Sequence, residues 1–415
     1  YDTAFYDPER GYTLDAFLDD GEREFGGYDV ILLWHAYPRI GLDPRNQVDF
    51  YRDMPGGLAG LRKVVDRAHE RNVRVFISYN PWDTGTRREG APPEAFLAEL
   101  VKALDVDGVF LDTMFGVSPE FRGVLEQAKP GVALSPEGSP DVDQMGVSNA
   151  SWAQGTVDDH NPPGLEHRKW IEPRHMRWQI MRWSPTHTEE IRRAFFNGSG
   201  MMVWENIFGT YNPWPQIDRA TWRRASAILR RYSDRFASDR WDPFYPTLLS
   251  EQPGLTNGVY AHRWPGEGGD LFTLVNMPKQ TVWGPSYEAG PWPLFEVPFE
   301  SDLSFYDLWN GQRHPLPVER RGDKLRVFGT LDRYSGLGCV LGVRGPEASE
   351  DLLAFLRSQR EEPDPAYASD ARNGRLPSVD PAPVEHATTP VGEAPPGMAA
   401  VPAADLTLEV THARR

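Results

Sequence analysis

The sequence predicts an α/β protein in which a (β/α)8 barrel is followed by an antiparallel β-sandwich. Strand-like runs alternate with amphipathic helical segments from residue 28 to about residue 137, a pattern typical of parallel βα units. Polar or aromatic residues stand at the carboxyl end of each run, where barrel enzymes carry their chemistry. Short alternating strands with turn residues between them replace this pattern from about residue 245 to residue 343, as in a sandwich.

The βα units account for the first half of the barrel. Strand-length runs rich in apolar residues stand at residues 28–35, 73–79, 108–111 and 132–134. The segments that follow the first two runs carry apolar residues at helical spacing, and Ser118 before proline marks the start of the next helix. Because the helical stretch at residues 14–25 precedes the run at 28, residues 1–6 are expected to hold the first barrel strand. Asp112 would then end the fourth strand.

Residues 138–200 give a weaker pattern, rich in Trp, His, Arg and Pro. Strands are expected near residues 147–152 and 176–181, with long loops around them. An apolar strand is expected at residues 201–206, and a basic helix at residues 222–236 closes the barrel. No G-x-G-x-x-G motif follows the first strand, so the dinucleotide-binding doubly wound fold loses its main support.

The sequence divides into a barrel at residues 1–240, a sandwich at residues 241–345 and a terminal region at residues 346–415. The expected sandwich strands stand at residues 258–264, 271–276, 303–308, 324–329 and 338–343. The terminal region carries a helix at residues 349–360, then a Pro/Ala-rich linker and a strand-like end. We therefore expect the chain to reach the start of a further domain.

Composition excludes several classes of function. Sixty acidic and 44 basic residues give a formal net charge of −16, which argues against nucleic acid or an anionic membrane as the main partner. The apolar runs are strand-sized, well below the roughly 18 residues that a membrane span needs. The single cysteine, Cys339, excludes an intramolecular disulfide and a multi-thiolate zinc site and is expected to be buried in the sandwich. No cofactor or metal is expected, and Asp158, Asp159 and His160 are interpreted as a solvated loop or a substrate contact.

Two carboxylates at strand ends are the strongest candidates for catalysis. Asp112 ends an apolar strand, and Glu137 ends the next one. Neighbouring strands lie about 4.8 Å apart, so two carboxyls at equal depth would meet the spacing of about 5–5.5 Å that retaining glycosidases use. The alternative for Asp112 is a cap on the following turn, and for Glu137 a place in the Pro-Glu-Gly turn.

Further polar and aromatic residues are expected to bind a sugar. Aromatic faces stack on the apolar face of a sugar ring, while His, Asn, Asp and Glu hydrogen-bond to its hydroxyls. The candidates are Trp34, His35, Asn80, Trp82, Asp83, Trp204, Glu205 and Asn206. Core packing is the alternative for each tryptophan. The expected partner is therefore an oligosaccharide or polysaccharide.

The motif Asp107-Gly-Val-Phe-Leu-Asp112 resembles a strand of the retaining α-glycoside hydrolases, the TIM-barrel superfamily of α-amylases, α-galactosidases and α-glucosidases. The resemblance gives Asp112 the role of nucleophile, and Glu137 matches the α-amylase acid/base by position. Residues 271–276 and 305–311 resemble the β-sandwich that follows such barrels. Position 110, usually Arg in α-amylases, is Phe110 here, so the resemblance implies a divergent member.

Two other functions remain open at this point. In a β-glycosidase, Glu137 would be the acid and Glu205 the nucleophile. In a carbohydrate-binding barrel without catalysis, the same residues would only hold the sugar. The chain begins at Tyr1 rather than Met, which is consistent with a removed leader. Together with the substrate class, this slightly favours a secreted or periplasmic location.

Overall fold

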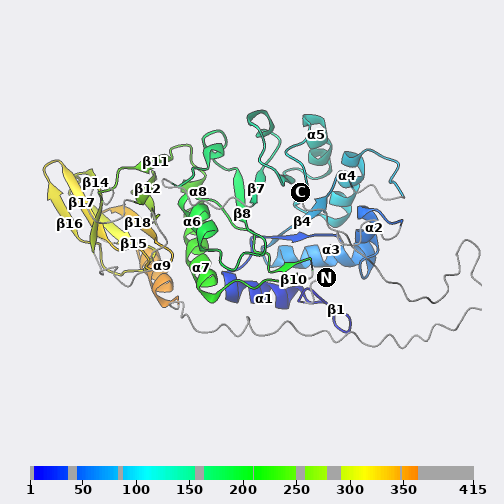
Figure 1. Ribbon diagram of the computed structural model, residues 1–415, viewed down its shortest axis with the longest axis horizontal. Coiled ribbons are helices and arrows are strands. Elements are labelled where there is room, and N and C mark those ends of the chain that lie inside the picture. The colour runs from blue at the N-terminus through cyan, green and yellow to red at the C-terminus, as the bar shows by residue number, and fades with distance from the viewer. Residues whose placement is uncertain are drawn as a thin grey trace, which may run out of the picture. The chain divides into compact units, whose positions relative to one another are not determined.

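The computed structural model describes residues 4–35, 44–82, 87–154, 163–208, 210–248, 258–277, 291–345 and 348–362. They belong to one compact unit that extends to residue 373, and Figure 1 shows their helices and strands. The strand-like end at residues 406–411 and most of the linker before it lie outside the described residues, and so do Asp158, Asp159 and His160.

A four-stranded parallel sheet forms the first half of the chain, with its strands in sequence order. Its strands are β3 (Val30–Leu33), β4 (Arg74–Tyr79), β5 (Gly108–Leu111) and β6 (Ala133–Pro136). The helices α1 (Leu14–Phe25), α2 (Gln47–Arg52), α3 (Gly57–Glu70), α4 (Pro93–Leu104) and α5 (Pro119–Ala128) accompany them. Leu, Val and Ile side chains of helices and strands share one aliphatic core on the outer face of the sheet. The predicted βα units are confirmed here, and Ser118 caps α5 by accepting a hydrogen bond from the Phe121 N–H.

The parallel order continues beyond β6 with less regular structure. β7 (Ala150–Gln154) pairs in parallel with β8 (Met176–Ile180), and Gln179 forms a parallel bridge with Met201. Asn149 joins the two groups of strands, since its N–H donates to the Leu134 carbonyl at 2.9 Å and its carbonyl accepts from the Met176 N–H at 3.2 Å. Among the described strands no hydrogen-bonded pair joins β3 to the segment at Met201. The structure therefore contains consecutive parallel strands, while closure into an eight-stranded ring stays a prediction.

The expectation of a first barrel strand at residues 1–6 is wrong for the described part of that segment. β1 (Tyr6–Asp7) pairs antiparallel with β2 (Gly11–Tyr12). The Asp7 carboxylate accepts hydrogen bonds from the N–H groups of Glu9 and Arg10 at 2.8 and 2.9 Å, which closes a tight turn and folds the segment back on itself. Consequently β3 is the first described strand of the parallel sheet, and Asp112 follows its third strand rather than a fourth.

The segment after Met201 also differs from the prediction. Only Met201 bridges to β8, and β9 (Asn206–Ile207) turns into a hairpin with β10 (Thr210–Tyr211). α6 (Thr188–Phe196) was not predicted. The basic helix begins earlier than expected, as α7 (Gln216–Arg231) followed by α8 (Ser233–Phe236), because Pro215 supplies an extended residue before its first turn.

Two antiparallel sheets form the second half of the described chain, and five of their eight strands were predicted from the sequence. A five-stranded sheet contains β11 (Asp242–Tyr245), β12 (Val259–Trp264), β13 (Leu271–Asn276), β18 (Leu337–Arg344) and β15 (Leu303–Asp307). A three-stranded sheet contains β14 (Trp292–Pro298), β17 (Lys324–Gly329) and β16 (Val318–Arg321). The sheets share an apolar core, in which the Phe272 and Phe295 rings stack at 4.2 Å. Cys339 is buried in β18, as predicted.

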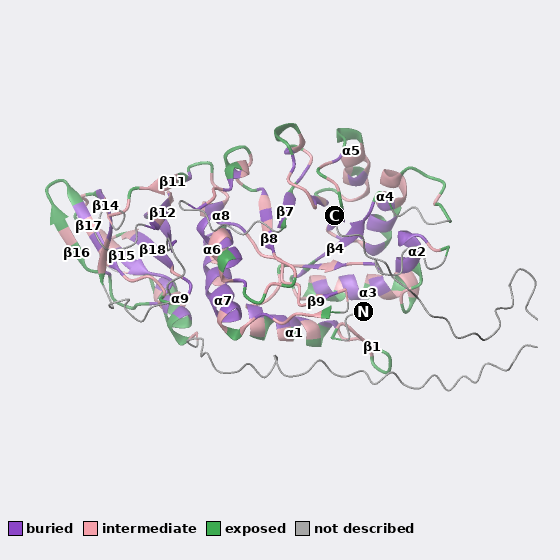
Figure 2. Cartoon of the chain, in the orientation of Figure 1, coloured by how far each residue is buried: buried purple, intermediate pink, exposed green. Residues whose placement is uncertain are grey.

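The N-terminal and C-terminal halves of the described chain share a second apolar core. It combines side chains of α6 and α7 with side chains of β12, β13, β18 and the C-terminal helix α9 (Glu350–Glu361). The Thr273 hydroxyl bridges the halves, because it accepts from Trp264 Nε1 and donates to the Phe196 carbonyl, both at 3.0 Å. Figure 2 shows buried residues on α6, α7 and the inner strands of the sandwich, and exposed residues on the outlying strand β16.

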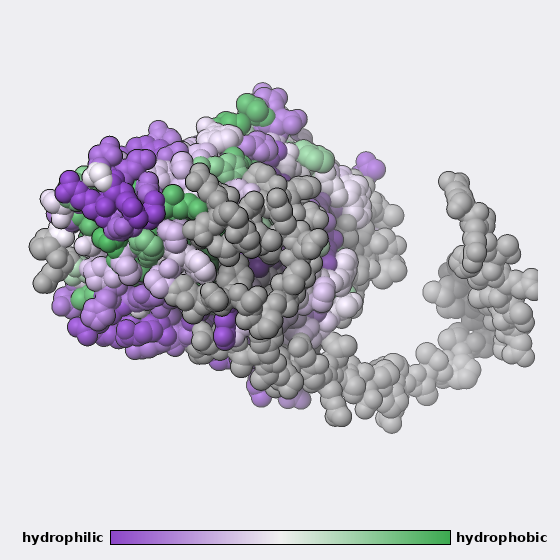
Figure 3. Space-filling view, turned by 60° about the vertical axis from the view of Figure 1, so that its left-hand side comes forward, coloured by the Kyte–Doolittle hydropathy of each residue, from purple (hydrophilic) through white to green (hydrophobic). Residues whose placement is uncertain are grey.

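The coloured residues that are visible in Figure 3 are mostly hydrophilic, with small apolar patches between polar residues. No helix in the described ranges combines the length and the apolar character of a membrane span.

Candidate functional site

Asn80, Asp112 and Glu137 lie side by side at the carboxyl edge of the parallel sheet. Tyr79 is in register with Leu111, and Leu111 with Pro136, so the residue after each strand lies at the same depth. The ladder continues one step further, as the Glu137 N–H donates to the Leu111 carbonyl at 3.0 Å. The structure thus brings together the two carboxyls that the sequence singled out.

Asp112 is held in a buried environment beside Glu137. Only 3% of its surface is exposed, and its Oδ2 accepts a hydrogen bond from Asn80 Nδ2 at 2.9 Å. Asn80 is fixed in turn by Gln47 on α2, which binds both its backbone N–H and its carbonyl. Burial, then the charge of Glu137 and a hydrogen bond with Glu137, raise the pKa of Asp112 to about 7. With its pKa raised in this way, Asp112 is partly protonated near neutral pH.

Glu137 is held by donors on both of its oxygens. Its Oε2 accepts from the Thr113 N–H at 2.9 Å, and its Oε1 faces Arg182 Nη2 at 3.4 Å. Thr113 has a φ of 60°, which is rare for a β-branched residue. Backbone strain of this kind clusters at functional sites, and here it belongs to the residue whose N–H binds a candidate catalytic group.

Arg182 was missed by the sequence analysis. It follows β8, donates to Gln154 Oε1 at 2.9 Å and lies over the Trp204 ring, with its guanidinium carbon 4.9 Å from the ring centroid. A second aromatic ring, that of Phe208, lies 5.8 Å away. The signal in the sequence was a cation directly after a predicted strand, at the same position as the polar residues that end the other strands.

Aromatic side chains fill the inner face of the parallel strands beneath the carboxyl pair. Phe110 stacks on Trp152 at 4.0 Å with an interplanar angle of 12°. The Trp34 ring lies 5.1 Å from that of Phe110 and 5.0 Å from that of Trp204. Trp34 and Trp204 therefore pack on this aromatic floor, together with the other side chains of their cluster.

Three of the expected sugar-binding residues make contacts away from the carboxyl pair. His35 is 2% exposed, and burial lowers its pKa to about 4, so it is neutral. The Glu205 carboxylate accepts from the Trp214 N–H at 2.8 Å, and the Asn206 carbonyl accepts from Trp204 Nε1 at 2.8 Å. None of these contacts involves the carboxyl pair, and sugar binding by the three residues stays a prediction.

Exposed aromatic rings follow several strand ends. Trp82 stands two residues after Asn80 and is 51% exposed, and its N–H donates to Asn80 Oδ1 at 3.0 Å. Phe115 and Trp183, close in sequence to Asp112 and Arg182, are 67% and 54% exposed. Such rings are available to stack on a sugar. Asp83, the remaining candidate, lies outside the described residues.

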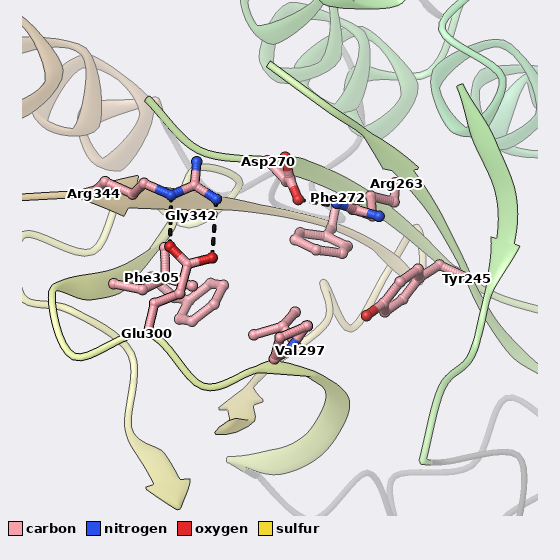
Figure 4. A pocket seen from close by; sticks show the side chains of 11 residues that line it. Tyr245, Arg263, Asp270, Phe272, Val297, Glu300, Phe305, Gly342 and Arg344 are labelled. Carbon is pink, nitrogen blue, oxygen red and sulfur yellow. Dashed lines mark hydrogen bonds and ion pairs between the residues drawn. The ribbon is translucent and has the colours of Figure 1, made fainter. Parts of the chain in front are cut away.

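The sandwich contains a cavity of its own, shown in Figure 4. Its volume is about 70 Å³, room for a few water molecules. Its charged groups already pair with one another: Arg344 with Glu300, and Arg263 with Asp270 at 2.7 Å. The cavity is too small and too well neutralised to be the sugar site.

One group among the described residues has metal-ligand geometry. Asp66, His69 and Asp105 place their ligand atoms within 4.8 Å of one another. Arg62 binds both aspartates, at 2.7 and 3.3 Å, and Lys129 binds Asp105 at 3.0 Å. These cations supply the positive charge that a metal ion would bring, and the group stands beside the residues that precede β4 and β5, at the opposite edge of the sheet from Asp112.

Comparison with known proteins gives similarities only at the level of structure. No protein-family model and no curated protein sequence matches the chain. The chain is similar to the α-amylase of Geobacillus thermoleovorans in complex with acarbose, with 15% identity, a TM-score of 0.48 and coverage of 82% of this chain and 95% of that one. It is also similar to the α-amylase of H. orenii, with 13% identity, a TM-score of 0.49 and coverage of 81% and 96%.

A third similar structure is the debranching enzyme of Nostoc punctiforme, with 11% identity, a TM-score of 0.47 and coverage of 80% of this chain and 88% of that one. All three relatives are glycoside-processing enzymes by name. At this degree of similarity, the chemistry of the chain has to be argued from its own residues.

Proposed function

We propose that the protein is a retaining glycoside hydrolase that cleaves an α-linked sugar with the carboxyl pair Asp112 and Glu137. One carboxylate attacks the anomeric carbon while the other carboxyl protonates the leaving oxygen, and water then hydrolyses the glycosyl-enzyme. The resemblance of the motif around Asp112 assigns the attack to Asp112 and the proton transfer to Glu137. Asn80 and Trp82 would contact the sugar, above a floor that contains Trp34 and Trp204.

The observation that carries this proposal is the adjacency of Asp112 and Glu137 at the ends of two neighbouring strands in register. A hydrolase of this type needs one ionised and one protonated carboxyl at the same pH, and burial and the nearby Glu137 raise the pKa of Asp112 to about 7. Inverting enzymes keep their carboxyls about 6.5–9.5 Å apart so that a water fits between them. Neighbouring strands lie about 4.8 Å apart, so carboxyls that follow two strands in register leave no such space, which favours retention of configuration.

The test is hydrolysis of a panel of aryl α- and β-glycosides by the wild type and by Asp112→Asn, Glu137→Gln and Glu205→Gln. We expect one α-glycoside to be cleaved and both pair variants to lose that activity. A matched control is Asp107→Asn, which changes the carboxylate at the other end of β5, where it binds His69 and Lys129; this variant should remain active.

The same panel decides between the competing functions. β-Glycoside cleavage that survives Asp112→Asn and is lost in Glu205→Gln would support the β-glycosidase with Glu205 as nucleophile. Sugar binding in calorimetry without turnover of any glycoside would support a non-catalytic binding barrel.

A further inference from the structure

Gln47 belongs to α2 rather than to a strand, and it binds the backbone of Asn80 at two points. Its Oε1 accepts a hydrogen bond from the Asn80 N–H at 2.8 Å, and its Nε2 donates to the Asn80 carbonyl at 2.7 Å. β3 ends at Leu33, in register with Ile77, so its ladder with β4 stops before Asn80. A single amide side chain therefore continues the hydrogen bonding of β4 beyond the end of the neighbouring strand.

The side chain of Asn80 connects this contact to Asp112. Asn80 Nδ2 donates to Asp112 Oδ2 at 2.9 Å, and Asn80 Oδ1 accepts from the Trp82 N–H at 3.0 Å. Asn80 is fully buried and Gln47 is 5% exposed, so water has little access to these bonds. The result is one chain of hydrogen bonds that runs from Gln47 through Asn80 to the proposed nucleophile.

α2 is fixed at the end that carries Gln47. Asn46 and Asp49 form a capping box, in which Asn46 Oδ1 accepts from the Asp49 N–H at 2.9 Å and Asp49 Oδ2 accepts from the Asn46 N–H at 3.1 Å. Glu89, in the segment that follows β4, binds Asn46 Nδ2 and Arg52, both at 2.7 Å. The position of Gln47 is consequently set by contacts that do not involve the carboxyl pair.

We propose that Gln47 is a positioning residue for the proposed hydrolysis: it holds the Asn80 amide against the Asp112 carboxylate and so stabilises the ionised form that attacks the anomeric carbon. The inference rests on the proposed function, in which Asp112 is the nucleophile. A hydrogen bond donated to a carboxylate favours its ionised form. Burial and Glu137 raise the pKa of Asp112 to about 7, and the hydrogen bond from Asn80 acts against them.

The charged groups that act on Asp112 come from elements other than α2. Besides burial, Glu137 after β6 raises the pKa of Asp112, whereas Arg182 after β8 acts to lower it. His35 lies beside α2, with its ring 6.1 Å from that of Tyr51, but its pKa of about 4 leaves it neutral around pH 7. A substitution at position 47 leaves all of these groups in place.

The ionisation of Asp112 can be followed without a substrate. When the aspartate carboxyl carbons are isotope-labelled, the NMR signal of Asp112 is the one missing from Asp112→Asn, and its titration midpoint gives the pKa. Gln47→Met has a side chain of similar length without the donor and the acceptor, and should raise this midpoint by roughly half to one pH unit. Arg52→Gln is the matched control on α2 and should leave the midpoint in place. An unchanged midpoint in Gln47→Met would overturn the inference.

A double substitution tests whether Gln47 acts through Asn80. Asn80→Ala should raise the midpoint of Asp112 at least as far as Gln47→Met does. Adding Gln47→Met to Asn80→Ala should give no further shift, because the amide that Gln47 positions is already absent. Additive shifts would overturn the inference, since Gln47 would then influence Asp112 by a route other than Asn80.

The pH profile of kcat/KM connects this effect to the reaction. Its acid limb reports ionisation of the nucleophile in the free enzyme, so Gln47→Met should move that limb to higher pH by the same amount as the NMR midpoint. If Gln47 only satisfied the buried backbone of Asn80, the variant would be less stable and less active without any movement of the limb, which would contradict a positioning role. A wild type that cleaves no α-glycoside would refute the proposed function, while the carboxyl titration would still decide whether Gln47 controls Asp112.

Discussion

The parallel strands β3 to β6, here called the regular half of the site, and residues 138–205, the irregular half, contribute to the candidate site in different ways. β3 to β6 are short strands accompanied by regular helices, and their ends provide Asn80, Asp112 and Glu137. Among the described residues from 138 to 205, the strands are linked by turns, short 3-10 helices and the helix α6, and this part provides Gln154, Arg182 and the Trp204 ring. The regular half thus places the two carboxyls, whereas the irregular half provides the cation that contacts Glu137.

The largest expected effect is on kcat, which variants of the regular half should lower far more than variants of the irregular half. Asp112→Asn and Glu137→Gln should each lower kcat by about 10³-fold or more, because each removes a reacting group. Gln154→Ala should lower it by about tenfold or less, since Gln154 only holds Arg182. Steady-state kinetics on the α-glycoside found in the panel measures both. Equal losses would show that the irregular half supplies a reacting group as well.

The next largest effect is on stability, and it concerns the contact between β5 of the regular half and β7 of the irregular half. Phe110 of β5 stacks on Trp152 of β7, and both are fully buried. Phe110→Ala should lower the free energy of unfolding by about 3–5 kcal/mol through lost burial and a cavity, measured by urea denaturation. Phe110→Leu is the control and should cost clearly less. If Phe110→Ala lowered the free energy of unfolding by less than about 1 kcal/mol, the packing of β5 against β7 would contribute little to stability.

The raised pKa of Asp112 predicts that its contribution to the free energy of unfolding falls as pH rises towards 7. The folded protein binds the Asp112 proton more tightly than the unfolded chain, in which the pKa is near 3.8. The contribution of Asp112 to the free energy of unfolding should therefore fall as pH rises from about 4 to about 7, by at most about 1.4 kcal/mol per pH unit. In Asp112→Asn this fall is absent, so the variant should melt at a higher temperature than the wild type near pH 7.

Asp107 at the other end of β5 is the matched control for this measurement. Burial acts to raise its pKa, but the Val75 N–H, His69 and Lys129 outweigh burial and lower it. Asp107→Asn should therefore melt at a lower temperature than the wild type near pH 7. A shift of the same sign in both variants would refute the electrostatic explanation.

The smallest effect tests the strain beside the pair. Thr113→Gly should change the free energy of unfolding by about 1 kcal/mol or less in the stabilising direction, because glycine adopts a φ of 60° without steric cost. Thr113→Val keeps a β-branched side chain and is the control. Destabilisation by glycine would show that the Thr113 side chain has a role that its backbone does not explain.

The sequence predicted the regular half well and the irregular half poorly, for identifiable reasons. Apolar runs that end in a single carboxyl located Asp112 and Glu137, since parallel strands in register bring their ends together. Arg182 follows a mixed run of apolar and polar residues, which gives no clear period, so its approach to Glu137 could not be derived. The N-terminal strand was misjudged because it was inferred from the position of the helix at residues 14–25, whereas Asp7 closes a local turn that pairs β1 with β2. The packing role of Trp34 could not be told from sugar stacking, since both require the same side chain.

The hydroxyl bridge of Thr273 to the Phe196 carbonyl has a consequence for protein engineering. Since α6, α7, the sandwich strands and α9 bury their side chains in one core, we expect the sandwich not to behave as an exchangeable module. A fusion that joins residues 1–240 to a foreign partner would expose the apolar surfaces of α6 and α7 and invite aggregation. Heating the intact chain should give a single calorimetric transition, in which the site and the sandwich lose their structure together.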